Sequence, residues 1–485
     1  MEDIIYKYLF LYNKSPRFLH YLLGSFYRKI PLSLRYGKVF CEYQKLLSES
    51  KLWTPEKITE YQWSKINKIL DHAYQNVPYY NLLFEEQNIR LKDIQSFEDF
   101  KRIPFLTKDI IRNNLNSLTA RNLNKSKFLY VNTGGSSGVP LGLYYQKGTT
   151  RSKELAFLLE IWKQAGYQFG DRIAVLRGNV IYSLKKNKFW QYDPIKNRMI
   201  LSSFHMIKEN LSKYIDQIRR FEPRFLHVYP SSLSILANYI KEKNVRNFPT
   251  IKAIFTSSES LFEWQAELFK NVFNCKVIDL YGATEAAIFA ANCPITNNYH
   301  IFPEYGYAEL IDNQGNDITE ENVIGELVGT SFDNYVMPLI RYRTDDYALL
   351  CREKECPCGK NFMSLKKIIG RKQEFFIDKT GSIITFTCAD DALWKIKEKI
   401  SAYQYIQYNP GKVILHLEQK ATLNKADFEA VRKDFLSFYP RFDVEIKLVK
   451  YIDRTKTGKF QYLVQKIPLK SEYIKNVEAD ISHIN

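Results

Sequence analysis

The sequence lacks the features of a secreted or a membrane-spanning protein. No signal peptide is visible, and the apolar stretch at residues 5–12 is interrupted by Lys7 and is too short to cross a bilayer. The seven cysteines are an odd number, and three of them lie within residues 351–358, which does not fit a secreted disulfide framework. We therefore expect a protein of the reducing cytoplasm.

The sequence also lacks a block of consecutive basic residues, although 70 Lys and Arg stand against 53 Asp and Glu and the formal charge is +17. Such an excess favours a polyanionic partner: nucleic acid, an anionic membrane surface or a phosphate-rich cofactor. The stretch that combines lysines with aromatic residues, KKNKFWQY at residues 185–192, is typical of a solvated hairpin. We do not expect nucleic-acid binding.

The first forty residues are basic and aromatic, and their only acids are Glu2 and Asp3. Helices of this composition are able to lie on an anionic membrane surface, which would make the protein peripheral at the inner membrane. Packing of these helices against the main domain is the simpler interpretation, and both stay open. The basic residues concerned are Lys7, Lys14, Arg17, Arg28, Lys29, Arg35 and Lys38.

No internal repeat and no low-complexity linker divides the chain, but its 485 residues are too many for one compact core. Helical and extended segments alternate between residues 211 and 281, which predicts a parallel, helix-covered sheet. Ligands gather beyond the carboxyl ends of such strands, where the segments TSSESL (256–261) and LYGATEA (280–286) lie. Hairpin-like segments follow residue 300, and a separate α+β set of elements follows Arg371.

A loop rich in glycine and serine, VNTGGSSGVPLG at residues 131–142, lies between two segments of strand-forming residues. Its glycines expose backbone N–H groups to an anion, and its hydroxyl groups are able to follow a phosphate. It is not a Walker loop, because no Gly-Lys-Ser/Thr and no amphipathic helix follow it. On the loop alone, a phosphate site and an ordinary hairpin turn are equally supported.

Five motifs, in this order, resemble those of the adenylate-forming (acyl-CoA synthetase-like) superfamily. They are TGGSSGVP (133–140), YGATEA (281–286), RYRTDD (341–346), GRKQE (370–374) and DRTKTGK (453–459). The segments LDHAYQNVPYY (70–80) and CPCGK (356–360) resemble more narrowly the phenylacetate–CoA ligase branch, including its relatives from capsular-polysaccharide gene clusters. Each motif alone is weak, but five in order are not expected by chance.

The resemblance implies an α/β fold in two domains. A large N-terminal domain over residues 1–371 would hold helix-covered sheets and a β-rich subdomain, with a mainly helical lead-in over residues 1–100. Residues 372–485 would form a small, mobile C-terminal α+β lid domain.

The resemblance also implies an ATP-dependent enzyme. A carboxylic acid attacks the α-phosphate of ATP, which gives an acyl-adenylate and pyrophosphate, and the acyl group then passes to an acceptor, with CoA expected. Two alternatives stay open: transfer to a sugar or carrier in cell-surface polysaccharide biosynthesis, and a non-catalytic relative that keeps the fold and the nucleotide. The sequence does not identify the acid, whose pocket we expect near Tyr229–Ser231, Thr256 and Ala283–Ile288.

The matching positions imply a nucleotide site. The residues that would hold the β- and γ-phosphates are Thr133, Gly134, Gly135, Ser136, Ser137 and Gly138. Those that would line the adenine pocket are Ser258, Glu259, Tyr281 and Gly282. Asp346 would accept both ribose hydroxyls, and Arg371 would anchor the nucleotide at the domain boundary. Thr284 and Glu285 would serve the α-phosphate and its Mg²⁺, because a carboxylate is a hard oxygen ligand suited to that ion.

Lys459, in the turn of DRTKTGK, is the residue that the resemblance implies as catalytic for adenylation. A long cationic side chain on a lid is able to bridge the carboxylate and the α-phosphate in the transition state. Two positions depart from the family pattern. Asp345 stands where a glycine is usual, so that an additional acid lies near the ribose or phosphates, and Gln373 stands where the hinge usually has an acid.

Four further residues predict a metal site. Cys356 and Cys358 have chelating spacing, and Cys293 with His300 offers a second pair directly after YGATEA. Thiolates with an imidazole suit tetrahedral Zn²⁺, and related sequences carry the same arrangement, which implies a closed structural site. Cys351 is a substitute ligand, and buried free thiols are the alternative.

Overall fold

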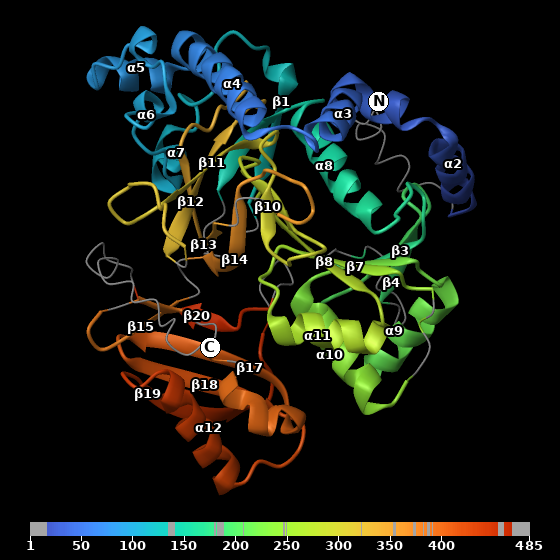
Figure 1. Ribbon diagram of the computed structural model, residues 1–485. Coiled ribbons are helices and arrows are strands. Elements are labelled where there is room, and N and C mark those ends of the chain that lie inside the picture. Colours follow the sequence, from blue (N-terminus) through green and yellow to red (C-terminus); the bar gives the residue numbers. More distant parts are fainter. Residues whose placement is uncertain are drawn as a thin grey trace. The chain divides into compact units, whose positions relative to one another are not determined.

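The structure is a computed structural model of the chain (Figure 1). It describes residues 17–133, 141–178, 181, 189–206, 208–245, 248, 250–321, 323–352, 356–371, 375–381, 383–385, 389, 391–453 and 460–467. The chain forms two compact units. The first comprises Met1–Glu309, Val328–Thr344 and Glu353–Ser364, and the second comprises Leu310–Leu327, Asp345–Arg352 and Leu365–Asn485.

The first unit is built on a sheet whose neighbouring strands follow the order β10-β9-β8-β7-β6-β3-β5-β4. The five strands from β8 to β5 run parallel, and β4, β9 and β10 are antiparallel to their neighbours. The strands are β3 (Ile173–Leu176), β4 (Trp190–Asp193), β5 (Arg198–Leu201), β6 (Phe225–Val228), β7 (Ala253–Ser257), β8 (Lys276–Gly282), β9 (Phe289–Asn292) and β10 (Tyr299–Ile301). The alternation of helix and strand predicted this parallel core.

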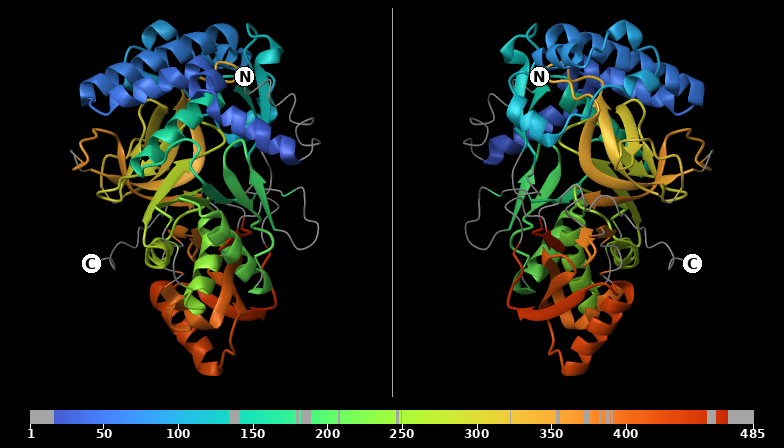
Figure 2. Two further views of the ribbon diagram at one scale, coloured as in Figure 1. Left: turned by 90° about the vertical axis from the view of Figure 1, so that its right-hand side faces the viewer. Right: turned by 90° about the vertical axis from the view of Figure 1, so that its left-hand side faces the viewer.

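Helices cover both faces of the parallel strands, because successive strand residues point to opposite faces and both sets are apolar. Phe225 packs with α3 (Leu32–Ser50) and α8 (Thr150–Gln164). Its neighbour Leu226 packs on the other face with α9 (Lys208–Phe221), α10 (Pro230–Glu242) and α11 (Glu263–Phe273). Figure 2 shows α9 to α11 in green to yellow against one side of these strands.

The N-terminal helices pack on the main body of this unit. Tyr43 of α3 lies against Phe157 of α8, with ring centroids 5.6 Å apart, and Ser152 donates to the carbonyl of Tyr36 at 3.1 Å. This packing is the simpler of the two interpretations of the basic N-terminal segment, and a membrane association remains a prediction. The preceding helix is α2 (Arg17–Lys29).

A second layer of helices and a two-stranded hairpin share their own apolar core with the segment at residues 332–342. The helices are α4 (Pro55–Asn76), α5 (Pro78–Glu86), α6 (Phe97–Phe100) and α7 (Lys108–Asn114), with single 3₁₀ turns at Leu91–Asp93 and Lys125–Lys127. Pro78 ends α4, as expected, and also begins α5, because proline is well tolerated in a first helical turn. The hairpin pairs β1 (Phe128–Asn132) with β2 (Gly142–Gln146), so the glycine-rich loop does join two strands.

Four longer strands are divided between the two units: β11 (Gly306–Ile311), β12 (Ile324–Ser331), β13 (Tyr342–Cys351) and β14 (Ser364–Arg371). They neighbour one another in this order, which is the β-rich subdomain that the hairpin-like segments predict.

The rest of the second unit has an α+β core. Its sheet has the order β19-β18-β17-β20, with β17 (Ile400–Asn409), β18 (Lys412–Gln419), β19 (Asp443–Val449) and β20 (Leu463–Gln465). The helix α12 (Lys425–Phe438) buries Phe435 against Tyr405 of β17 and against Phe376 of the hairpin β15 (Phe375–Ile377)–β16 (Ile383–Thr385). The expected helix near residue 391 is a 3₁₀ helix over Asp391–Lys399.

The fold class is therefore confirmed: α/β with large sheets, helices on their faces and a small C-terminal α+β core. The exact boundary at residues 371/372 and the mobility of the small domain stay predictions.

One buried carboxylate of the first unit makes a pH-dependent stability testable. Glu304 is fully buried, and neither of its oxygens has a hydrogen-bond partner among the described residues. Burial raises the pKa of Glu304 to about 7. Because the folded pKa lies above the unfolded value, the folded state holds the proton more tightly. The contribution of Glu304 protonation to the free energy of unfolding is complete below the unfolded pKa, and it is lost as the pH rises through about 7.

We therefore expect Glu304→Gln to increase the free energy of unfolding above pH 7 by about 1–3 kcal/mol and to change it little below pH 4.5. Urea unfolding of both proteins across this pH range measures the difference. Glu267→Gln, at an exposed position of α11, is the matched control. An equal effect of Glu304→Gln at both ends of the range would contradict the raised pKa.

Candidate active site and metal site

The ends of β7 and β8 bring two of the predicted segments together. These parallel strands pair with Ser257 opposite Leu280, so that Ser258–Glu259 and Tyr281–Gly282 leave the sheet side by side. Ser258 has a φ of 69° and Ala286 a φ of 53°, a left-handed conformation that is uncommon without glycine. Such backbone conformations cluster at ligand sites, and here they lie at the carboxyl edge of the sheet.

The Glu259 carboxylate is tied to the start of α10. One oxygen accepts from the backbone N–H of Ser231 and the other from its hydroxyl, each at 3.0 Å. These groups belong to the first turn of the helix, where unpaired N–H groups and the helix dipole favour a negative charge. The interaction fixes the loop after β7 against the loop after β6.

Thr284 and Glu285 are held by tyrosines from two distant segments. The buried Glu285 accepts a hydrogen bond from the Tyr342 hydroxyl at 2.7 Å, and Tyr342 belongs to the RYRTDD motif. The Tyr145 hydroxyl of β2 donates to the carbonyl of Thr284. The strand after the glycine-rich loop, YGATEA and RYRTDD therefore meet at one place in the first unit.

The remaining predicted nucleotide residues are placed only in part. Thr133 closes the hairpin: its N–H donates to the carbonyl of Leu141, and its hydroxyl accepts from the Leu141 N–H, both at 2.9 Å. Gly134, Gly135, Ser136, Ser137, Gly138, Gln373 and Lys459 lie outside the described residues. Asp346 is buried in the part of β13 that belongs to the second unit, and Arg371 is the last residue of β14.

Asp345 precedes Asp346 in the same strand with a φ of 59°, and its N–H donates to Glu326 at 3.1 Å. Asparagine and aspartate tolerate this conformation better than most residues, so the acid replaces the usual glycine without an unusual backbone. The roles of all these residues stay predictions.

The structure also adds a residue that the sequence analysis did not name. Arg177 directly follows β3, and its guanidinium donates to Ser258 Oγ and to His227 Nε2, each at 2.7 Å. The feature of the sequence that could have indicated Arg177 is a charged residue immediately after the apolar strand sequence IAVL. Its neighbours could not be found that way, because they come from strands 50 and 81 residues further along the chain.

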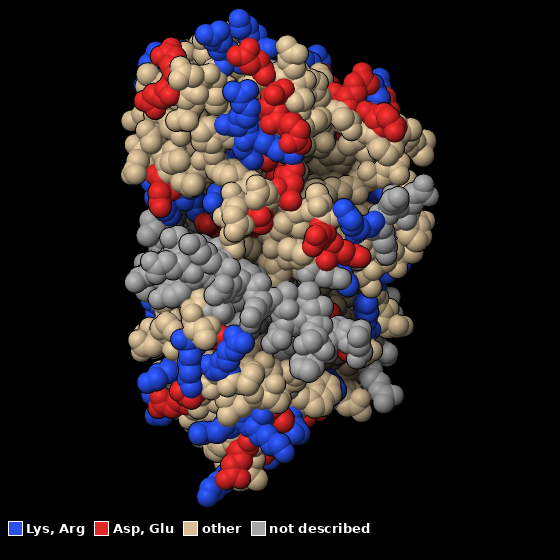
Figure 3. All heavy atoms as spheres, turned by 60° about the vertical axis from the view of Figure 1, so that its left-hand side comes forward, with Lys and Arg blue, Asp and Glu red and all other residues tan. Residues whose placement is uncertain are grey.

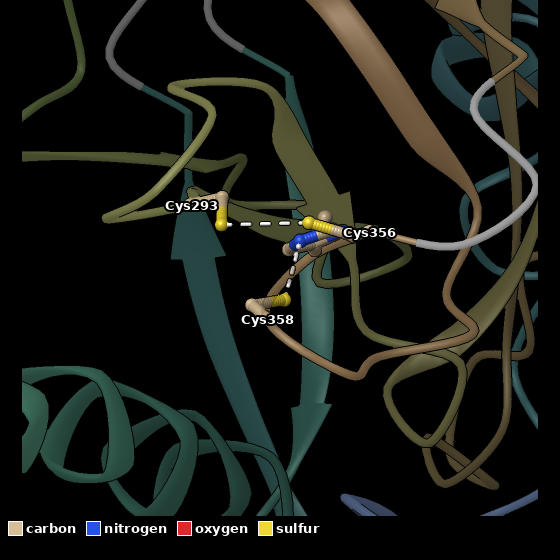
Figure 4. Close-up of side chains that lie close together, drawn as sticks. Cys293, Cys356 and Cys358 are labelled. Atoms are coloured by element: carbon tan, nitrogen blue, oxygen red, sulfur yellow. Dashed lines mark hydrogen bonds between the residues drawn. The ribbon is translucent and has the colours of Figure 1, made fainter.

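The four predicted metal ligands do come together. Each of Cys293, His300, Cys356 and Cys358 offers one ligand atom, and these atoms lie within 4.8 Å of one another (Figure 4). The Sγ atoms of Cys293 and Cys356 are 3.7 Å apart, and Cys358 Sγ is 3.3 Å from His300 Nε2. Tetrahedral Zn²⁺ with Zn–S bonds of about 2.3 Å separates two sulfurs by about 3.8 Å. The donor set and its spacing therefore fit a zinc ion.

Neighbouring groups orient the histidine for this role. The Ser364 hydroxyl is 3.0 Å from His300 Nδ1 and lies 3.2 Å from the carbonyl of Phe362, to which it donates. The Ser364 oxygen then accepts from Nδ1–H, which leaves the lone pair of Nε2 directed at the thiols. Burial, together with the nearby Lys360 ammonium, lowers the pKa of His300 to about 4, so the imidazole is neutral as a metal ligand must be.

The site ties two loops of the first unit together. Cys293 follows β9 and His300 lies in β10, the strand paired with it, whereas Cys356 and Cys358 lie in the loop before β14. Three thiolates and a divalent ion would carry one net negative charge, and the Lys360 ammonium lies beside it. Cys351 is buried at the end of β13 and is not one of the four residues.

Sequence comparisons agree with this description. Residues 376–466 match the family model of the CapK C-terminal domain. The protein CapK of Staphylococcus aureus is 27% identical over 94% of the chain and 99% of its own length. A phenylacetate–coenzyme A ligase of Pseudomonas putida is 24% identical over 80% of the chain and 88% of its length.

Among solved structures, a 2-hydroxyisobutyryl-CoA ligase in the postadenylation state has a TM-score of 0.68 at 18% identity and covers 86% of the chain and 93% of its own. The fold and the motifs thus define an adenylate-forming ligase. Within this class the chain fits the phenylacetate–CoA ligase-like family that includes CapK, and the resemblance inferred from the motifs is confirmed.

None of the helices in the described part of the chain has the length and apolarity that a bilayer crossing requires. On the face shown in Figure 3, the described Lys and Arg side chains are interspersed with Asp and Glu. The positive charge of the chain is therefore dispersed on this face, as the absence of a basic block predicts.

We expect protein purified without added metal to contain about one zinc ion per chain. Cys358→Ser should remove most of it and lower the thermal stability, because metal binding is linked to folding. Elemental analysis and thermal unfolding of the wild type and the variant check both points. Cys275→Ser, a thiol outside the site, should keep the metal. Reduced, freshly prepared protein that contains no zinc would rule the site out.

Proposed function

We propose that this enzyme activates a carboxylic acid with ATP as the acyl-adenylate, releases pyrophosphate, and transfers the acyl group to CoA. The observation that supports it is the convergence of β2, YGATEA and RYRTDD around Thr284 and Glu285, beside the Ser258–Glu259 turn at the carboxyl edge of the sheet. Similar solved structures are complexes of CoA ligases with an acyl-AMP, and two of them also contain CoA.

In the first half-reaction a carboxylate oxygen of the acid attacks the α-phosphorus of ATP, and the bond to pyrophosphate breaks. Both reactants are anions, so the site must supply positive charge and hold the geometry of attack. We assign the β- and γ-phosphates to Thr133–Gly138, the adenine to Ser258–Glu259 and Tyr281–Gly282, and the ribose and its anchor to Asp346 and Arg371.

Thr284 and Glu285 would face the α-phosphate. Glu285 is suited to hold Mg²⁺, which would neutralise developing charge on the phosphates. The Tyr342 hydroxyl occupies one acceptor site of this carboxylate, and its remaining lone pairs stay available. Lys459 would supply the remaining positive charge from the small domain. The zinc site would have a structural role, because it would hold together the loop after β9 and the loop before β14.

A second acceptor is favoured by one observation, the match to CapK over nearly its whole length. In that case the adenylate would be consumed by a sugar hydroxyl or amine or by a carrier in cell-surface polysaccharide biosynthesis. The first half-reaction is the same for both acceptors. This half-reaction is tested by ATP–pyrophosphate exchange with a panel of aryl, fatty, hydroxy and amino acids. If none of the acids supports exchange, the result favours a nucleotide-binding protein without catalysis.

Lys459→Ala is expected to slow adenylate formation by about 10²–10³-fold, as for the loss of one preorganised group that stabilises charge. The fold and much of the ATP affinity should remain. Rates of pyrophosphate exchange measure the effect. Lys450→Ala, at an exposed position of the same unit, should keep the wild-type rate. A wild-type rate for Lys459→Ala would remove this lysine from the mechanism.

The small domain must rotate between the half-reactions, because Lys459 cannot stay at the phosphates while CoA approaches the adenylate from the same side. We place the hinge near residues 371–374. Gln373→Pro fixes φ and removes one backbone donor, so it should spare adenylation and slow acyl transfer, and acyl-adenylate should accumulate. Single-turnover measurements of each step, with Gln373→Ala as control, separate the two effects. Equal slowing of both steps would place the hinge elsewhere.

A further inference from the structure

A cluster formed by the half-buried Arg177, the buried His227 and the exposed Ser258 lies at the carboxyl ends of three neighbouring parallel strands, β3, β6 and β7. Arg177 is the first residue after β3, His227 lies in β6, and Ser258 follows β7. The guanidinium of Arg177 donates hydrogen bonds to both His227 and Ser258. This is the edge of the sheet at which α/β proteins bind their ligands.

The hydrogen-bond partners of the Arg177 guanidinium are neutral. His227 accepts one of its hydrogen bonds, and burial beside this cation lowers the pKa of His227 well below its usual value, so the imidazole is uncharged. The Ser258 hydroxyl accepts a second. The Nε atom is buried and has no partner, and among the residues that the structure describes no carboxylate lies within the 4.0 Å of an ion pair.

A cation without an ion pair in such surroundings is costly, because desolvation penalises the charge and Glu154 and Glu259 offset it only from beyond ion-pair distance. Burial lowers the pKa of Arg177 accordingly, but a guanidinium keeps its proton in proteins. Two other buried cations of this unit have carboxylate partners, whereas the buried Arg35 lies over the rings of Tyr27 and Phe169. Lys153 lies 3.0 Å from Asp333, and Arg341 lies 2.8 Å from Glu309. Arg177 is thus prepared for an anion that is not part of the protein.

Glu154 of α8 connects this cluster with the adenylation motif. Its side chain is exposed to solvent, yet desolvation by the surrounding protein raises its pKa, and Arg177 opposes that effect. Glu154 and Arg177 therefore interact electrostatically although no ion pair joins them. The pKa of Tyr145 is raised first by burial of its own hydroxyl and second by the charge of Glu154. The same hydroxyl donates a hydrogen bond to the carbonyl of Thr284.

The geometry points to Arg177 as a specificity-determining residue that binds a second, anionic group of the acid substrate, and we propose that the substrate is a dicarboxylic acid. A guanidinium presents Nε–H and Nη–H along one edge, which matches the two oxygens of a carboxylate. Glu154 and Glu259 repel a multiply charged phosphate more strongly than a single carboxylate, which carries less negative charge. Tyr229, whose ring lies 5.5 Å from the guanidinium, belongs to the segment in which we expect the acid pocket. This inference rests on the proposed function.

The test compares acids of equal length with one or two carboxylates: butyrate with succinate, pentanoate with glutarate, and hexanoate with adipate. Titration calorimetry measures their binding, and pyrophosphate exchange measures their activation. In wild type we expect one dicarboxylate to bind at least ten-fold more tightly than its matched monocarboxylate. Arg177→Gln should remove that preference by weakening the dicarboxylate about 10–100-fold, the effect of one charged hydrogen-bonded pair.

Arg172→Gln is the matched control, because Arg172 precedes the same strand at its other end and is exposed. It should leave the preference unchanged. Arg177→Lys, which keeps the charge but not the planar fork, should retain part of the preference. If Arg177→Gln does not fold, the affinities of Arg177→Lys and of the wild type for the matched acids test whether Arg177 binds a second carboxylate.

Two results would overturn the inference. One is wild-type protein that binds the monocarboxylates as tightly as the dicarboxylates. The other is Arg177→Gln protein in which ATP affinity falls while the preference among acids persists, because the anion at Arg177 would then be a phosphate. Dicarboxylate binding that depends on Arg177 without exchange for any acid would support the subsite and contradict the proposed activity.

Discussion

The parallel pairing of β3, β6, β7 and β8 is the constraint on which the site depends. Parallel strands end at the same edge, so each connecting loop begins there whatever its sequence. The loops after β6 and β7 are then tied to each other by Ser231 and Glu259, and Arg177 extends the contact to β3. One sheet edge thereby collects groups from four separate segments between residues 177 and 285.

Buried charge is handled in two ways in the first unit. The pairs Lys153–Asp333 and Arg341–Glu309 are internally balanced, and although burial alone would raise the pKa of Asp333, Lys153 and Lys65 hold it at about 2. Such pairs fix distant segments, since breaking one would leave an uncompensated charge. The carboxyl edge of the sheet differs, because Arg177 is hydrogen-bonded to neutral groups there and Glu154 and Glu259 act on it only at longer range. Stability favours the first arrangement, and the proposed binding of an anionic ligand would account for the second.

The candidate metal site and the active-site edge are connected through neighbouring strands of one sheet. β8 carries YGATEA at its end, β9 pairs with it, and β10 pairs with β9 and holds His300. A tetrahedral ion at the start of the loop between β9 and β10 would limit how far this hairpin moves. It would therefore support the position of Thr284 and Glu285 without touching the reactants, which is how a closed structural site acts.

The sequence by itself determined the element types, the parallel core, the order of the motifs and the four residues that come together as a candidate metal site. These depend on local patterns: apolar runs with helical or strand periodicity, and thiols with chelating spacing. Even so, Asp391–Lys399 became a 3₁₀ helix, because periodicity does not distinguish a tight helix from an α-helix over a short stretch.

Only the tertiary structure decided which side chains meet. Tyr145 and Tyr342 are ordinary strand residues in the sequence, and pairing between segments 57 and 139 residues apart brings their hydroxyls to Glu285 and Thr284. The same holds for Arg177, whose hydrogen bonds to His227 and Ser258 come from segments distant in the sequence. Local sequence encodes what a residue is able to do, whereas burial and long-range packing decide what it faces, and those depend on the whole chain.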